Sequence, residues 1–213
     1  MRRRRKRPID EALTRSIVVA VAENMIRQGI IDPRGKTDAQ LRAELLRNLR
    51  RFSSETGDLP VVIAYDEGLL AAARGAHRRQ DLPLACILYA TWLEHRLNAI
   101  ISIAGARRGI ADEVQAQIMR EVPLRGKTSW LPQLMGVRRI HERHANAVIQ
   151  ISEFRNQFVH YKWQAKTHDV RQDQEKALRR ALGQIERTIT YLQRYENEVV
   201  FFKSKSRVRR LLS

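Results

Sequence analysis

The residues best suited to chemistry lie in one short stretch, residues 153–161. Arg155 can hold the charge of a phosphate through two parallel hydrogen bonds, and His160 can accept or donate a proton near neutral pH. RNA is cleaved without a metal when its 2′-hydroxyl loses a proton and attacks the neighbouring phosphorus. A histidine that moves the proton and an arginine that stabilises the charged phosphorus suit that reaction.

The spacing of these residues constrains how they could form a site. On one helix, Arg155 and His160 lie about 140° apart, whereas Asn156 and His160 share a face. Either the helix ends between Arg155 and His160, or their side chains flank a common groove. Cleavage needs an acid and a base, and the stretch supplies one histidine, so a symmetric dimer would complete the site. The structural alternative, which spacing alone favours, pairs Arg155 with Glu153 and uses His160 to cap the helix C-terminus.

The charge of the chain indicates a polyanionic partner. Its 213 residues include 40 Lys and Arg against 23 Asp and Glu, which gives a net charge of +17. Such an excess favours RNA or DNA over other partners. The N-terminal residues 1–8 form a basic arm that self-repulsion should keep disordered and that is predicted to bind nucleic acid. Its cations are Arg2, Arg3, Arg4, Arg5, Lys6 and Arg7.

Two amphipathic helices are predicted in residues 9–58, which we treat as an N-terminal extension. The first has an apolar residue at every fourth position from Ile9 to Met25, including Leu13 and Ile17. The second begins at Thr37, where Gln40 is placed to complete a capping box. Two such helices cannot cover their own apolar faces, so they are expected to pack against the later part of the chain or against a second copy.

Residues 59–213 are predicted to form a helical bundle, so the fold class is all-α. Helices are expected at residues 69–79, 82–104, 110–122 and 137–158, and residues 127–132 are expected to connect two of them. A long last helix begins near Val170 and carries a narrow apolar seam that suits packing along another helix, including that of a second copy. The seam comprises Leu178, Leu182, Ile185, Ile189 and Leu192.

The block from about residue 66 to residue 200 resembles a HEPN domain, an all-α, up-and-down bundle. The signature of that family is an arginine, a polar residue, a few further residues and a histidine, and residues 155–160 fit it. Residues 88–98 resemble the central helix of the family, in which Glu94 is the acidic residue. Residues 127–131 resemble the segment before the last pair of helices. The resemblance does not cover residues 1–58.

The resemblance implies a metal-independent endoribonuclease that needs no cofactor and works as a homodimer with one composite cleft. Arg155 and His160 would carry catalysis, Asn156 would orient His160 or the phosphate, and Glu94 would fix Arg155. Many relatives act in toxin–antitoxin or antiviral defence systems, so an antitoxin is an implied partner. In one branch a nucleotidyltransferase modifies a tyrosine two places after the histidine. Here Tyr161 follows His160 directly and Lys162 holds that place.

Other observations limit the remaining possibilities. The single cysteine, Cys86, cannot form an intrachain disulfide, and no apolar run reaches the length of a membrane helix, so we expect a cytoplasmic protein. His141 and His144 could bind a metal from one helix face, but no third ligand accompanies them. The main alternative function is a basic helical module that binds RNA or a partner and cuts nothing. A DNA-binding regulator using residues 9–52 ranks last.

Overall fold

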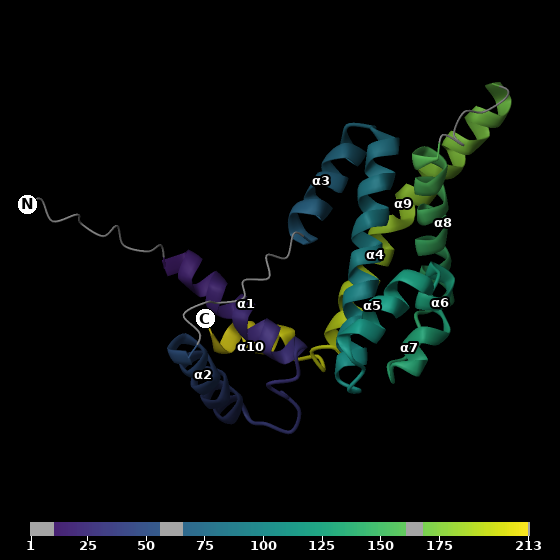
Figure 1. The fold of residues 1–213 in the computed structure, drawn as a ribbon. Helices are drawn as coiled ribbons and strands as arrows, with labels where there is room; N and C mark the ends of the chain where they lie inside the picture. The colour runs from purple at the N-terminus through teal and green to yellow at the C-terminus, as the bar shows by residue number, and fades with distance from the viewer. Residues whose placement is uncertain (1–10, 56–65, 161–167, 213) are drawn as a thin grey trace, which may run out of the picture. The chain divides into compact units, whose positions relative to one another are not determined.

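The computed structural model describes residues 11–55, 66–160 and 168–212, and every element within those ranges is a helix. The all-α prediction is therefore confirmed (Figure 1). The helices belong to two compact units. The terminal unit combines Met1–Val62 with Val200–Ser213, and the central unit is Ile63–Val199. The last residues of the chain therefore group with the N-terminal helices, whereas the predicted boundary placed them with the bundle.

The terminal unit contains α1 (Glu11–Arg27), α2 (Asp38–Glu55) and α10 (Lys205–Leu211). Helix α10 packs against both other helices. Its Val208 is fully buried, as are Leu41 and Leu45 of α2. The expectation that the two N-terminal helices need a further partner is therefore met from the far end of the same chain.

The apolar stripe predicted for α1 is only partly used. Leu13 and Ile17 are exposed, whereas Met25 is buried. Ala22 and Ile26 are buried beside Met25, so the packed face of α1 is confined to its C-terminal half. The reason is that α2 and α10 are the helices that cover α1, and α10 has only two turns.

Basic residues of α10 bind the acidic residues that face them. Arg209 donates to Glu23 of α1 at 2.6 Å, and Arg207 donates to Asp38 at the start of α2, also at 2.6 Å. Arg207 also donates to the backbone oxygen of Lys36 at 2.7 Å. Arg207 is the main cause of the lowered pKa of Asp38. The basic C-terminal segment is thus part of the packing of this unit.

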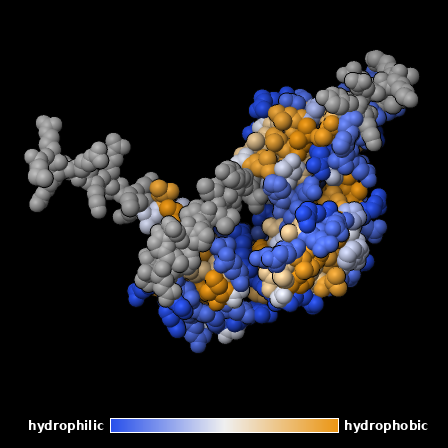
Figure 2. Space-filling model, in the orientation of Figure 1, coloured by the Kyte–Doolittle hydropathy of each residue, from blue (hydrophilic) through white to orange (hydrophobic). Residues whose placement is uncertain are grey.

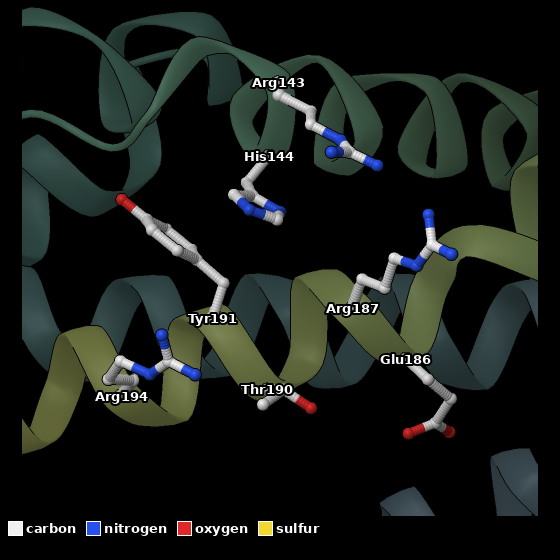
Figure 3. A pocket seen from close by; sticks show the side chains of 7 residues that line it. All are labelled: Arg143, His144, Glu186, Arg187, Thr190, Tyr191 and Arg194. Carbon is white, nitrogen blue, oxygen red and sulfur yellow. The ribbon is translucent and has the colours of Figure 1, made fainter.

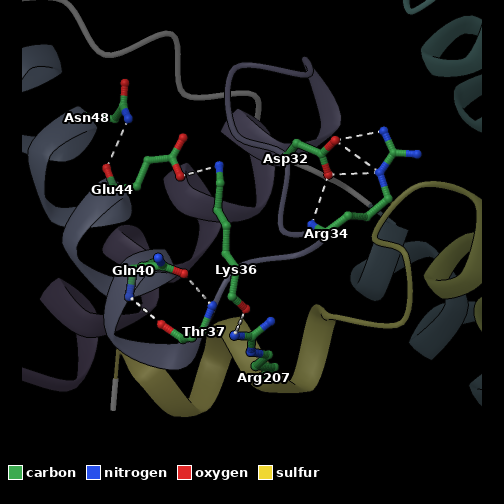
Figure 4. A network of polar contacts seen from close by, with 8 residues as sticks. All are labelled: Asp32, Arg34, Lys36, Thr37, Gln40, Glu44, Asn48 and Arg207. Carbon is green, nitrogen blue, oxygen red and sulfur yellow. Dashed lines mark hydrogen bonds and ion pairs between the residues drawn. The ribbon is translucent and has the colours of Figure 1, made fainter.

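The predicted capping box at the start of α2 is present (Figure 4). The backbone N–H of Thr37 donates to Oε1 of Gln40 at 2.8 Å, and the N–H of Gln40 donates to Oγ1 of Thr37 at 3.3 Å. Each side chain thereby satisfies a backbone donor that the first helical turn leaves free. Lys36 forms an ion pair with Glu44 one turn further along α2, which ties the entering loop to the helix.

The central unit is built around α4 (Leu82–Ala106), which runs as the sequence predicted. Helices α3 (Asp66–Arg78), α8 (Glu142–Val159) and α9 (His168–Val199) pack against it. The N-cap Asp81 accepts a hydrogen bond from the backbone of Leu84. Most of the circumference of α4 is buried, including Trp92, Leu97 and Ile100. A helix with so little exposed surface must be central, because its apolar faces need cover on several sides.

The seam of α9 is buried within its own chain. Each of its five apolar residues is at most 1% exposed, and α9 packs against α4 and α8. The prediction of a narrow packing seam is confirmed, but the suggestion that this seam joins two copies is wrong. The physical reason is that α4 and α8 already cover it.

A smaller core lies over the C-terminal end of α4. Ile101 and Ala104 pack there with Leu131 and Met135. The surrounding elements are α5 (Asp112–Glu121), α6 (Leu124–Thr128) and α7 (Trp130–Leu134). Figure 2 shows hydrophobic residues at the surface in this region, where Val114, Trp130 and Leu134 are exposed.

Two predicted boundaries in the central unit were wrong. Residues 127–132 are not a plain connection, because they include the end of α6 and the start of α7. Helix α8 begins at Glu142 and not near Val137. Gly136, with φ of +74°, ends α7, and two tyrosines of α9 then hold the backbone that leads into α8. Tyr195 donates to the oxygen of Arg138, and Tyr191 accepts from the N–H of His141.

We predict that Leu45→Ala lowers the free energy of unfolding of the terminal unit by about 2–5 kcal/mol, because it leaves a cavity in a packed core. Leu45 is 0% exposed, whereas its neighbour Leu46 is 37% exposed and provides a matched control. Leu46→Ala should cost less than about 1 kcal/mol. Urea denaturation followed by circular dichroism measures both, and equal losses for the two variants would contradict the packing described.

Candidate functional site

Arg155 lies in the last turns of α8 and is bound to α4. Its Nη2 donates to Oε2 of Glu94 at 3.0 Å and to Oγ of Ser152 at 3.4 Å. The side chains of Arg155 and Glu94 are 27% and 35% exposed. Within the described part of the chain, the buried Nε–H of Arg155 has no hydrogen-bond partner. The guanidinium is therefore held through Nη2 alone and is partly open to solvent.

The structural alternative proposed for Arg155 was wrong about its partner. Glu153 does not bind Arg155 but lies 3.8 Å from Arg125 of α6 in an exposed ion pair. The carboxylate that binds Arg155 is Glu94, and this is the contact that the HEPN resemblance implied. Because Glu94 and Arg155 come from different helices, their bond also links α8 to α4.

His160 is the C-cap of α8, with φ of −99° and ψ of 21°. Its backbone N–H donates to the oxygen of Asn156 at 3.1 Å, which closes the last turn. The side chains of Asn156 and His160 are both exposed. The helix therefore ends after Arg155 and before His160, which is one of the two arrangements that the spacing allowed. Tyr161 and the basic residues Arg2–Arg7 lie outside the described residues.

Lys127 is a charged residue near this site that the sequence did not indicate. It is 4% exposed, and its Nζ donates to the backbone oxygen of Met119 at 2.7 Å. Burial lowers the pKa of Lys127, and the carboxylate of Glu94 acts in the opposite sense. Glu94 thus experiences two cations, Arg155 and Lys127. The sequence offered no sign of it, because a five-residue helix such as α6 is too short to show a periodic pattern.

A separate cleft of about 460 Å³ lies between α8 and α9 (Figure 3). Helix α8 contributes Arg143 and His144, and α9 contributes Arg187, Tyr191 and Arg194, together with Glu186 and Thr190. This cleft was not predicted from the sequence. The sequence did contain a pattern that points to this cleft: arginines recur every seven residues along α9, at positions 180, 187 and 194.

Two of the rings that line this cleft stack on each other. The rings of His144 and Tyr191 lie 4.1 Å apart at an angle of 12°. Nδ1 of His144 is 3.1 Å from the hydroxyl oxygen of Thr188. Burial lowers the pKa of His144, and the charges of Arg143 and His141 lower it further. The neutral imidazole is therefore favoured at this position.

The described residues do not support a metal site at His141 and His144. His141 precedes α8 and caps it through Nδ1, which accepts from the backbone of Arg143 at 3.3 Å. No group of three or more potential metal-binding side chains comes together among the residues that the structure describes. None of the described helices is long and apolar enough to cross a membrane.

Comparisons of the chain with protein-family models, with curated proteins and with solved structures found no match. A functional assignment therefore rests on the geometry and chemistry of the residues themselves.

We predict that the contribution of His144 to stability decreases as the pH falls. Its folded-state pKa is lower than the ordinary value of 6.5, so the unfolded chain binds the proton more readily. The contribution is full above pH 6.5 and is lost as the pH falls through that value towards the folded-state pKa. The free energy of unfolding of the wild type, relative to His144→Gln, should therefore fall between about pH 7 and pH 5. An NMR titration of the ring with a midpoint above 6.5 would contradict this assignment.

Proposed function

We propose that the protein is a metal-independent endoribonuclease of the HEPN type that works as a homodimer. The observation that carries this proposal is the bond between Glu94 and Arg155 at 3.0 Å, close to the helix end where His160 is exposed. An arginine fixed by a carboxylate can present its remaining N–H groups in a defined direction. The sequence resemblance and the net charge of +17 support the same function.

Arg155 would stabilise the transition state. Oε2 of Glu94 and Oγ of Ser152 both accept hydrogen bonds from Nη2, and the described residues provide no partner for Nη1. The Nη1 edge is suited to donate to a phosphate oxygen. Such preorganised donors are most effective when they are oriented before negative charge develops. Glu94 then has a positioning role, because it acts on the phosphate through Arg155.

His160 would move protons at both steps of the bond exchange. The proton of the 2′-hydroxyl passes to His160 of one copy while the 2′-oxygen bonds to phosphorus. The bond from phosphorus to the 5′-oxygen breaks, and the 5′-oxygen receives a proton from the second copy's His160. The products are a 2′,3′-cyclic phosphate and a 5′-hydroxyl. The bonds and protons of this reaction balance without an oxidant, a metal or a further reactant.

The dimer would have to use a surface other than the α9 seam, since that seam is buried in the same chain. Val159 is 53% exposed and directly precedes His160. A second copy that packs on Val159 would bring two copies of His160 to one interface. Burial of an exposed apolar residue also favours such an association.

We predict that His160→Ala abolishes RNA cleavage without changing the fold, because the reaction loses its proton carrier. His95 of α4 is also an exposed histidine, and His95→Ala is the matched control with retained activity. Incubation with total RNA, in the presence of EDTA, measures both. Cleavage by His160→Ala at the wild-type rate would overturn the proposal.

We predict that activity per chain rises with protein concentration and then levels off, because two copies form one site. Val159→Asp should lower the activity per chain and shift sedimentation towards the monomer, since it places a charge at the proposed interface. Val114→Asp changes an equally apolar exposed residue of α5 and is the control. A constant specific activity from a monomeric protein would contradict the dimer.

A second candidate is a basic binding module that cuts nothing. The observation that favours it is the same Glu94–Arg155 pair, which would also serve simply to hold α8 against α4. This candidate predicts RNA binding by the wild type and no cleavage product at any protein concentration. The biological setting that we propose for either function is toxin–antitoxin or antiviral defence, with an antitoxin or a nucleotidyltransferase as possible partner, and it rests on the sequence resemblance alone.

A further inference from the structure

One exposed stripe of α9 carries cations and no carboxylate. Its positions are three or four residues apart, so they share one face of the helix. All are exposed. In chain order the stripe comprises Lys176, Arg180, Gly183, Arg187, Thr190 and Arg194. We call these six residues the basic stripe.

The three arginines of the basic stripe are available to bind a ligand. Among the described residues, Arg180, Arg187 and Arg194 form no ion pair or hydrogen bond. Arg179, on the neighbouring face, behaves differently: it binds Glu175 at 2.7 Å and Gln80 at 2.6 Å. Lys176, the first cation of the stripe, lies 3.9 Å from Asp173, so only the three arginines are left without an acidic partner among the described residues.

The α8–α9 cleft makes the middle of the stripe concave. Arg187, Thr190 and Arg194 line it from α9, and Arg143 faces them from α8 (Figure 3). Glu186, the one carboxylate among the described residues that line the cleft, is bound by Arg74 at 2.7 and 2.8 Å and by the hydroxyl of Tyr89. Three arginines therefore share this cleft with an acid that is already paired, so an anion would relieve their mutual repulsion.

The spacing of the stripe indicates the form of that anion. Arginines seven residues apart lie about 10 Å apart along the helix axis, and Arg180 and Arg194 are about 21 Å apart. A single phosphate cannot contact all of them, whereas a chain of phosphates can. No large apolar side chain of α9 is exposed among its described residues, which disfavours insertion into a membrane surface.

We propose that the basic stripe, with Arg143, binds the phosphate backbone of a nucleic-acid strand. The charged groups that the stripe and Arg143 offer are guanidinium and ammonium cations, so the contacts are to phosphates and carry no base sequence. This site lies apart from Arg155 and His160 in the chain. It binds nucleic acid whether or not that pair cleaves it.

Fluorescence anisotropy with a labelled 2′-O-methyl RNA tests the proposal on the full chain, because this RNA lacks the hydroxyl that cleavage requires. The variant is Arg187→Gln with Arg194→Gln. The control is Arg78→Gln with Arg120→Gln, which removes two exposed arginines from α3 and α5. Both variants change the net charge equally, so only the location of the lost charges differs.

Loss of two phosphate contacts should reduce the slope of log affinity against log salt by about 1.4. If the variant and the wild type bind equally at 1 M salt, that change corresponds to about 25-fold weaker binding at 0.1 M. The control should keep the wild-type slope. Equal losses for both double variants would overturn the proposal, because they would indicate attraction to net charge alone.

Three further arms identify the ligand. A DNA strand of the same sequence that binds as well indicates backbone recognition without use of the 2′-position, and tighter binding of RNA indicates that this position contributes. Competition by millimolar inorganic phosphate as strong as that by the strand would overturn the proposal in favour of a single-anion site. Binding to anionic vesicles through Arg187 and Arg194, without binding to either strand, would overturn it in favour of a membrane surface.

Discussion

The fold of the central unit depends on the need to cover α4 on nearly all sides. Two charged residues of this helix, Glu94 and Arg96, make that covering specific. They are two residues apart and therefore project about 200° apart, so each meets a different neighbour. Glu94 binds Arg155 of α8, and Arg96 binds Glu196 of α9 at 2.9 Å. The second pair is only 10% and 3% exposed, and a buried charge without its partner costs about 3–5 kcal/mol. Any slip of α9 along α4 would break it, so the apolar faces supply cohesion and the ion pairs set the register.

The candidate site and the basic cleft both depend on this register. Docking of α8 against α4 puts Arg155 beside Glu94, and the end of α8 then leaves His160 exposed. At the opposite end of α8, the hydroxyls of Tyr191 and Tyr195 hold the backbone that enters the helix. This fixes where Arg143 meets α9. One helix therefore carries a proposed reaction site near its C-terminus and a proposed backbone-binding site near its N-terminus.

The sequence predicted those features that depend on local or periodic signals. The capping box at Thr37 and the seam of α9 needed only short spacings, and both are present. The start of α8 was missed because tyrosine hydroxyls about fifty residues away hold its lead-in, and spacing does not reveal such contacts. The partner of Arg155 was likewise misjudged from spacing alone, since the nearby Glu153 is engaged elsewhere. The pairing with Glu94 was anticipated only through the family resemblance.

The terminal unit has a consequence for how the protein is made. Helices α1 and α2 emerge from the ribosome early, but α10, which completes their packing, is synthesised only after the entire central unit. Folding of nascent chains generally proceeds from the N-terminus, one unit at a time. Here the central unit can fold first, before α10 is available to pack against the apolar residues of α1 and α2. The terminal unit is therefore completed only after the central unit has been synthesised.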